Sequence, residues 1–150
     1  MKRILILAVV LSTPCFAKFQ GFTETSKANG QFLITHFTVS DRAQFHLGCG
    51  VGTDDKPFSV IGLKHPSLFG FHGSKHIQLS IDGKQKVSIN GGTNEYDDMY
   101  YSRNPPKELL SEIANGNSVE VLFFSSKRRV TFSLEGSEQI YTKLWDKCGL

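Results

Sequence analysis

The chain has 150 residues, of which 39% are hydrophobic and 21% are charged, and its formal net charge at neutral pH is +3. This length predicts one domain with a real core, and no internal repeat, low-complexity tract or linker divides it. The nearly neutral charge argues against nucleic acid as the partner.

The first 17 residues have the features of a secretory signal peptide. Two basic residues precede an apolar run at 4–11, which is too short to span a bilayer, and Pro14 and small residues follow. Cleavage after Ala17 would leave one exported domain, residues 18–150, with 15 Lys and Arg, 14 Asp and Glu and a net charge of +1. A lipoprotein acylated at Cys15 is disfavoured, because Pro14 would precede the cleaved bond. We expect a periplasmic or secreted bacterial protein with no transmembrane segment in the mature chain.

Several segments of the mature chain alternate apolar and polar residues, which is the period of a β-strand. The expected strands are, in chain order, 19–23, 31–39, 45–49, 58–63, 77–81, 87–89, 118–124 and 129–134. Between the fifth and sixth of these we expect a loop of three to five residues. Such a loop pairs Ile81 with Val87 and Leu79 with Ile89, which keeps these four apolar side chains on one face.

Two segments carry the period of a helix. The first follows a tyrosine-rich stretch, 91–101, that we interpret as a polar connection. Asn104 can cap this helix and Pro105 suits its first turn. The buried side of this helix is formed by Leu109, Leu110 and Ile113, and Asn115-Gly116 ends it.

The second helix begins after Gly136, where apolar residues recur at every fourth position and Gly149 provides a C-cap. The fold class that follows is α+β. We expect a mostly antiparallel β-sandwich or half-barrel of about seven or eight strands, closed by two short helices.

Two cysteines remain in the mature chain, Cys49 on the apolar side of a strand and Cys148 on the apolar side of the terminal helix. In an oxidising compartment they are best explained as one disulfide that joins two core-facing surfaces, rather than as two free thiols. A loop of about 100 residues would be closed, which the chain-entropy treatment values at about 4 to 5 kcal/mol.

The chain ending resembles a known family. A short helix, a hairpin that ends Phe132-x-Leu134-x-Gly136, a helix with Cys148-Gly149 and an upstream Leu47-Gly48-Cys49 strand look like the TagO-type (also called VasI) periplasmic accessory proteins of type VI secretion systems. The likeness covers roughly residues 44–150. Invasion-associated locus B proteins, which are small exported β-rich domains, share a looser version. The resemblance implies a secretion-system accessory and brings no catalytic residues.

Side chains capable of metal chemistry occur in two segments. His65, His72 and His76 could converge on zinc, but exposed loop histidines are the favoured interpretation. The acidic segment with Glu95, Asp97 and Asp98 could hold calcium, but its spacing fits no standard loop, and a solvated turn is preferred. We expect no catalytic residues, no metal and no cofactor. For His36 and His46, core packing and surface packing remain equally open.

Loop aromatics are the candidate contacts for a partner. The alternative is that these rings fold down and cap the sandwich. The expected surface combines loops 69–76 and 95–101, with Phe69, Phe71, His72, His76, Tyr96, Tyr100 and Tyr101.

The favoured hypothesis is a non-enzymatic exported envelope protein that binds a protein or peptidoglycan partner, plausibly as a secretion-system accessory. The alternative is a periplasmic inhibitor or immunity protein that acts against a wall-degrading enzyme. A metal-dependent hydrolase built on the three loop histidines is the third.

Overall fold

The computed structural model describes residues 18–26, 30–66, 73–93, 99–123 and 127–150. The elements within these residues are β1 (Gly21–Ser26), β2 (Phe32–Ser40), β3 (Ala43–Val51), β4 (Pro57–Lys64), β5 (Gly73–Ile81), β6 (Val87–Thr93), β7 (Met99–Arg103), α1 (Lys107–Asn115), β8 (Ser118–Phe123), β9 (Arg128–Ser133) and α2 (Ser137–Cys148). Paired strands are antiparallel, and the order across the one sheet is β1-β2-β3-β4-β7-β6-β5-β8-β9. The predicted α+β class is confirmed.

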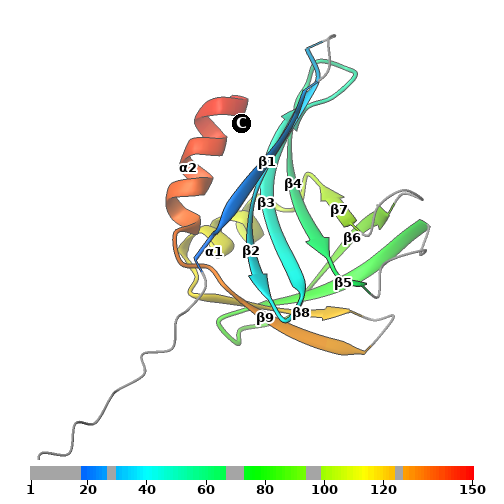
Figure 1. Cartoon of the computed structure of the whole chain (residues 1–150), viewed down its shortest axis with the longest axis vertical. Coiled ribbons are helices and arrows are strands. Elements are labelled where there is room, and N and C mark those ends of the chain that lie inside the picture. The colour runs from blue at the N-terminus through cyan, green and yellow to red at the C-terminus, as the bar shows by residue number, and fades with distance from the viewer. Residues whose placement is uncertain (1–17, 27–29, 67–72, 94–98, 124–126) are drawn as a thin grey trace, which may run out of the picture.

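The sheet is bent into an open half-barrel. Figure 1 shows β1–β4 standing upright and β5, β8 and β9 crossing below them, with β7 and β6 joining the two parts. The bend brings the Phe45 ring of β3 to 5.8 Å from the Phe132 ring of β9. One core fills the space between the two parts, and its largest fully buried side chains come from strands and helices alike: Tyr100, Phe45, Phe123, Phe132, Leu47, Ile61, Leu63, Leu79, Leu110, Ile113 and Leu134.

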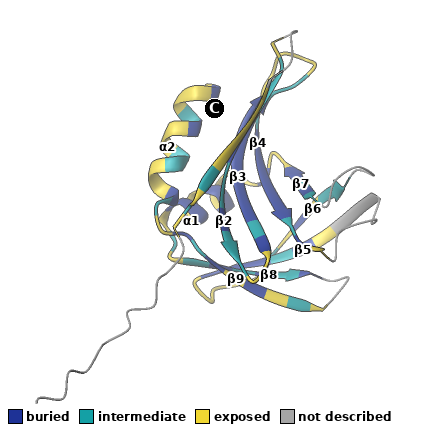
Figure 2. Cartoon of the chain, viewed as in Figure 1, coloured by how far each residue is buried: buried dark blue, intermediate teal, exposed yellow. Residues whose placement is uncertain are grey.

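The two helices close one end of the half-barrel, on the side of β1–β4 away from β7 and β6 (Figure 1). Helix α2 buries Leu144 and Cys148 toward the sheet and presents exposed residues on its other side (Figure 2). A disulfide joins Cys148 to Cys49 of β3 across a sequence separation of 99, with the two Cα atoms 6.3 Å apart. Gly149 ends the helix in the left-handed conformation and its N–H donates to the carbonyl of Trp145, as predicted. Neither helix is long and apolar enough to cross a bilayer, in the part of the chain that is described.

The stretch 91–101 was wrongly predicted as a connection, because it contains the end of β6 and the start of β7. The side chains of β7 alternate between the two faces of the sheet, as expected for a strand: Tyr100 and Ser102 point into the core, while Tyr101 and Arg103 point away from it. Tyr100 is fully buried, and its hydroxyl donates to the carbonyl of Ile89 at 3.1 Å. The hydrogen bond to the backbone is what allows a tyrosine at this position to be buried.

The prediction that Asn104 caps α1 is wrong, because Pro106 occupies the N-cap position. Asn104 instead adopts a left-handed conformation, φ 48°, beside β4. Its backbone N–H donates to the carbonyl of Ser59 at 2.9 Å, and its side-chain oxygen accepts the Ser59 N–H at 3.2 Å. Asn104 therefore links the end of β7 to β4, next to the strand pair that carries the site described below.

The β5–β6 register differs from the prediction by two residues. Leu79 pairs with Val87 and Ile77 with Ile89, so the faces were predicted correctly but the loop is longer. Ile81 instead pairs with Val119 of β8. The carboxylate of Asp82 accepts hydrogen bonds from the backbone N–H groups of Asn117 and Ser118, at 2.8 to 3.1 Å. The β5–β6 loop is therefore bound to the start of β8 and does not form a tight hairpin turn.

Candidate functional site

The side of β1–β4 and β7 that points away from the core, here called the outer face, carries three rows of facing residues. The strand registers define these rows. The rows are Thr25, Leu33, Gly50 and Phe58; Thr23, Thr35, Gly48, Val60 and Arg103; and Phe37, His46, Gly62 and Tyr101.

Two aromatic rings lie over glycines of the central strands on the outer face, and one of them, Phe58, approaches too closely for any other residue. A Cβ at Gly50 would stand 2.8 Å from Cζ of Phe58 and would also meet the carbonyl oxygen of Phe32. A Cβ at Gly62 would stand 3.5 Å from Cε1 of Tyr101. Glycine in a strand interior often marks such a close approach. The Phe58 ring therefore lies against the bare backbone of Gly50, the Tyr101 ring lies at an ordinary contact distance from Gly62, and the two rings form a low platform.

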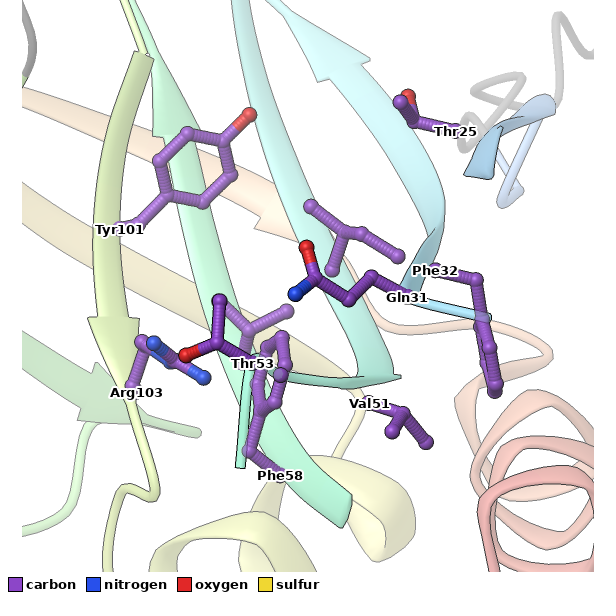
Figure 3. A pocket seen from close by; sticks show the side chains of 11 residues that line it. Thr25, Gln31, Phe32, Val51, Thr53, Phe58, Tyr101 and Arg103 are labelled. Carbon is purple, nitrogen blue, oxygen red and sulfur yellow. The ribbon is translucent and has the colours of Figure 1, made fainter. Parts of the chain in front are cut away.

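A pocket of about 420 Å³ opens above this platform. Its lining includes Leu33 and Val60 as an apolar floor, with Phe58 and Tyr101 beside them. Figure 3 shows the side chains of Gln31, Thr53 and Arg103 converging over Phe58, while Tyr101 lies to one side. Clefts of this size with apolar walls and a few convergent polar groups are typical of small-ligand sites.

Arg103 is the one charged residue among the described residues that line the pocket. Its guanidinium carbon lies 3.8 Å from the centroid of the Phe58 ring, which is a cation–π contact. None of the ion pairs formed among the described residues involves Arg103. A Cβ at Gly52 would come within 3.1 Å of its Nη2 atom, so the glycine leaves room for the guanidinium at the pocket rim.

A chain of hydrogen bonds crosses the outer face beside the pocket. The hydroxyls of Thr23 and Thr35 lie 2.8 Å apart, Thr35 Oγ1 lies 3.0 Å from Nδ1 of His46, and Nε2 of His46 lies 2.9 Å from Oε1 of Gln44. His46 is 1% exposed, and burial, with the Lys64 charge as a smaller cause, lowers its pKa to about 4. With Nε2 as the protonated nitrogen, both ring nitrogens are satisfied by neutral partners. The imidazole is thereby held neutral inside the sheet face.

No family model, curated protein or solved structure matches the chain.

The residues predicted to contact a partner lie in different environments. Of the three that the structure describes, Tyr101 lines the pocket. Tyr100 was predicted at the surface but is buried in the core, because β7 turns it inward. His76 is exposed on β5. The remaining four, Phe69, Phe71, His72 and Tyr96, lie outside the described residues.

His65 was expected in an exposed loop, but it is 4% exposed at the end of β4. Its ring stacks on Phe123 of β8 with centroids 4.8 Å apart, and burial is the main cause that lowers its pKa. The contact of His65 with Phe123, which joins the two parts of the sheet, explains why this histidine is buried. Among the residues that the structure describes, no three His, Cys, Asp or Glu side chains form a group that could hold a metal ion. The acidic segment 95–98 lies outside them.

The sequence prediction missed Phe58, Arg103 and Leu33 as site residues. A signal was present, since Gly48 and Gly50 occupy the same side of their strand and Gly62 follows on the next. Consecutive same-side glycines indicate a face that something approaches closely. Which rings approach it depends on the β4–β7 pairing, and no local pattern reveals that pairing.

Proposed function

We propose that this protein is a non-enzymatic binding protein of the bacterial envelope, with a secretion-system accessory role as its expected context. The outer-face pocket is where it holds its protein or peptidoglycan partner. One observation carries the proposal: the pocket combines an apolar floor with a guanidinium fixed over a ring and neutral polar groups at the rim. Such lining groups bind and orient a ligand.

Binding is favoured over catalysis because two of the groups that could move protons, His46 and Tyr100, are buried. His46 is sealed in the sheet face with hydrogen bonds to Thr35 and Gln44. Tyr100 is turned into the core, and burial raises its pKa. A general acid or base has to come within hydrogen-bond reach of a substrate, and neither group lies at the accessible surface.

Export is supported by the signal-peptide pattern of residues 1–17 together with the disulfide between Cys49 and Cys148. The mature protein purified from the periplasm or the medium is expected to begin at Lys18 by intact-mass measurement. Thiol alkylation without reductant should leave both cysteines unmodified. A protein that retains residues 1–17 and reacts with three equivalents of alkylating agent, one for each of its three cysteines, would refute export.

Site-directed photo-crosslinking in living cells tests the binding face. A photoreactive amino acid at Thr53 or Gln31, at the pocket, is compared with one at Thr131, which is exposed on β9. We expect a discrete adduct with one envelope protein or with peptidoglycan at the pocket positions only, and its loss when Tyr101→Ala is added. The same adducts at Thr131 would show that the outer face is not the binding site.

The inhibitor alternative is separated by enzyme assay. A stoichiometric excess of the purified mature protein is added to a muramidase and to an amidase of the cell wall. Full activity of both enzymes is the expected result. Dose-dependent inhibition that Tyr101→Ala abolishes would replace the accessory role with an inhibitory one at the same pocket.

A further inference from the structure

We propose that the outer-face pocket recognises a carboxylate, carried on a small apolar body such as an N-acylated amino acid or the carboxyl-terminal residue of a peptide. This inference rests on the proposed function, because it names the chemistry of the ligand at that same pocket. The carboxylate pairs with Arg103, and the apolar body lies over Leu33 and Val60.

Stacking on Phe58 makes Arg103 a prepared carboxylate receptor. The guanidinium carbon lies over the ring at 3.8 Å from its centre, and none of the ion pairs among the described residues uses the N–H groups of Arg103. A planar fork held in this way matches a carboxylate with two parallel hydrogen bonds, and it loses less side-chain freedom on binding than a free arginine does.

The charge of the pocket lining favours a ligand that carries a single negative charge. Among the lining residues that the structure describes, Arg103 is the only charged one, and the others are apolar, glycine, threonine, glutamine or tyrosine. A phosphate monoester carries up to two negative charges and would find one cation. Asp54 stands nearby, since its Oδ1 and Nη2 of Arg103 both lie 3.1 Å from the position of a Gly52 Cβ, but the two form no ion pair.

The rest of the pocket fits an apolar body with one more polar group. Leu33 and Val60 form the floor, and Tyr101 stands beside them. Gln31 reaches over the same space from the side opposite Tyr101, and Thr53 lies next to Arg103 and Phe58 in this view (Figure 3). An acylated amino acid offers that pattern: a carboxylate at one end, an apolar side chain, and an amide that the rim groups can meet.

The test uses N-acetyl-leucine, its amide N-acetyl-leucinamide, and an acetylated tripeptide ending in leucine as the free acid and as the amide. Binding to the mature protein is measured by calorimetry and by amide chemical shifts in the NMR spectrum. At least one free acid should bind, and its amide should bind roughly 10- to 100-fold more weakly, the range expected for a charge-assisted hydrogen bond.

Variants locate the interaction. Arg103→Met keeps the apolar stem and should weaken binding of the acid about tenfold while leaving the amide unchanged. Arg129→Met, which removes an exposed arginine on β9, is the matched control and should change neither. Asp54→Asn should strengthen binding of the acid, because it removes a nearby negative charge. Equal binding of acid and amide, or unchanged acid binding in Arg103→Met, would overturn the inference.

The probes also separate the two sources of the carboxylate. Equal affinity for the single amino acid and the tripeptide assigns the site to a free small acid, and tighter binding of the tripeptide assigns it to a chain terminus. Photo-crosslinking from Thr53 is an independent readout. If its adduct forms while no probe distinguishes acid from amide, the pocket binds its partner by other chemistry, so the inference is wrong and the proposed function stands.

Discussion

The Cys49–Cys148 disulfide is predicted to provide a large share of the stability of this domain. Its sequence separation of 99 residues corresponds to a loss of unfolded-state entropy of about 4.7 kcal/mol in the chain-entropy treatment. Cys49 is 0% and Cys148 7% exposed, so removing both sulfurs also leaves a small void in the core. Domains of this size are usually stable by only about 5–15 kcal/mol.

Urea unfolding of the Cys49→Ala/Cys148→Ala variant measures this contribution. Trp145, the single tryptophan, is half-buried on α2 and stacks on Tyr141 at 4.7 Å, so its fluorescence reports whether the helix stays docked. For a typical urea dependence of about 2 kcal/mol per molar, the midpoint should fall by roughly 2 M. Reductant should lower the wild-type midpoint similarly and leave the variant unchanged. Wild-type and variant stabilities within about 1 kcal/mol of each other would refute the reasoning.

Three further substitutions test the outer face and its support. Gly50→Ala should cost about 1–3 kcal/mol, because the new methyl group meets Phe58 and the β2 backbone; a gain in thermal stability would contradict this packing. Burial of His46 should make stability fall by about 3 kcal/mol between pH 6.5 and 4, since the unfolded chain protonates at His46 at a higher pH than the folded one; His46→Gln should remove this part of the fall in urea titrations and leave the part that His65 contributes, and an unchanged pH dependence would contradict the reasoning. Asn104→Ala should be less stable than Asn104→Gly by about 1 kcal/mol, because glycine adopts the left-handed backbone at a lower cost than alanine does, and the reverse order would argue against this backbone conformation at the link between β7 and β4.

Local periodicity was sufficient to predict the C-terminal third of the fold. Val119, Val121 and Phe123 are buried on β8 at the predicted alternate positions, and Leu144 and Cys148 are buried on α2 four residues apart. These elements combine short sequence separation with strong apolar patterns. The disulfide followed from the same patterns, because they placed both cysteines on core-facing sides.

The errors came from elements whose conformation depends on distant partners. Strand β7 has only five residues, and it pairs with β4 across a sequence separation of about forty, so nothing in its local pattern required a strand. Asn104 has the chemistry of a helix cap, but the nearby Ser59 backbone provides both a donor and an acceptor for it. The pocket was missed for the same reason, since Phe58 and Arg103 meet only through the β4–β7 pair.

The position of the disulfide also affects when the protein can be oxidised. A chain that crosses a membrane with its N-terminus first delivers β1–β4, and with them Cys49, long before Cys148. Throughout that interval the thiol of Cys49 has no second cysteine of the mature chain with which to form a wrong bridge. For a chain exported as we propose, oxidation would be a final step that joins α2 to β3 only after nearly the whole chain has emerged. Until then, the four antiparallel strands β1–β4, which carry most of the outer face, would be held by their own pairing alone.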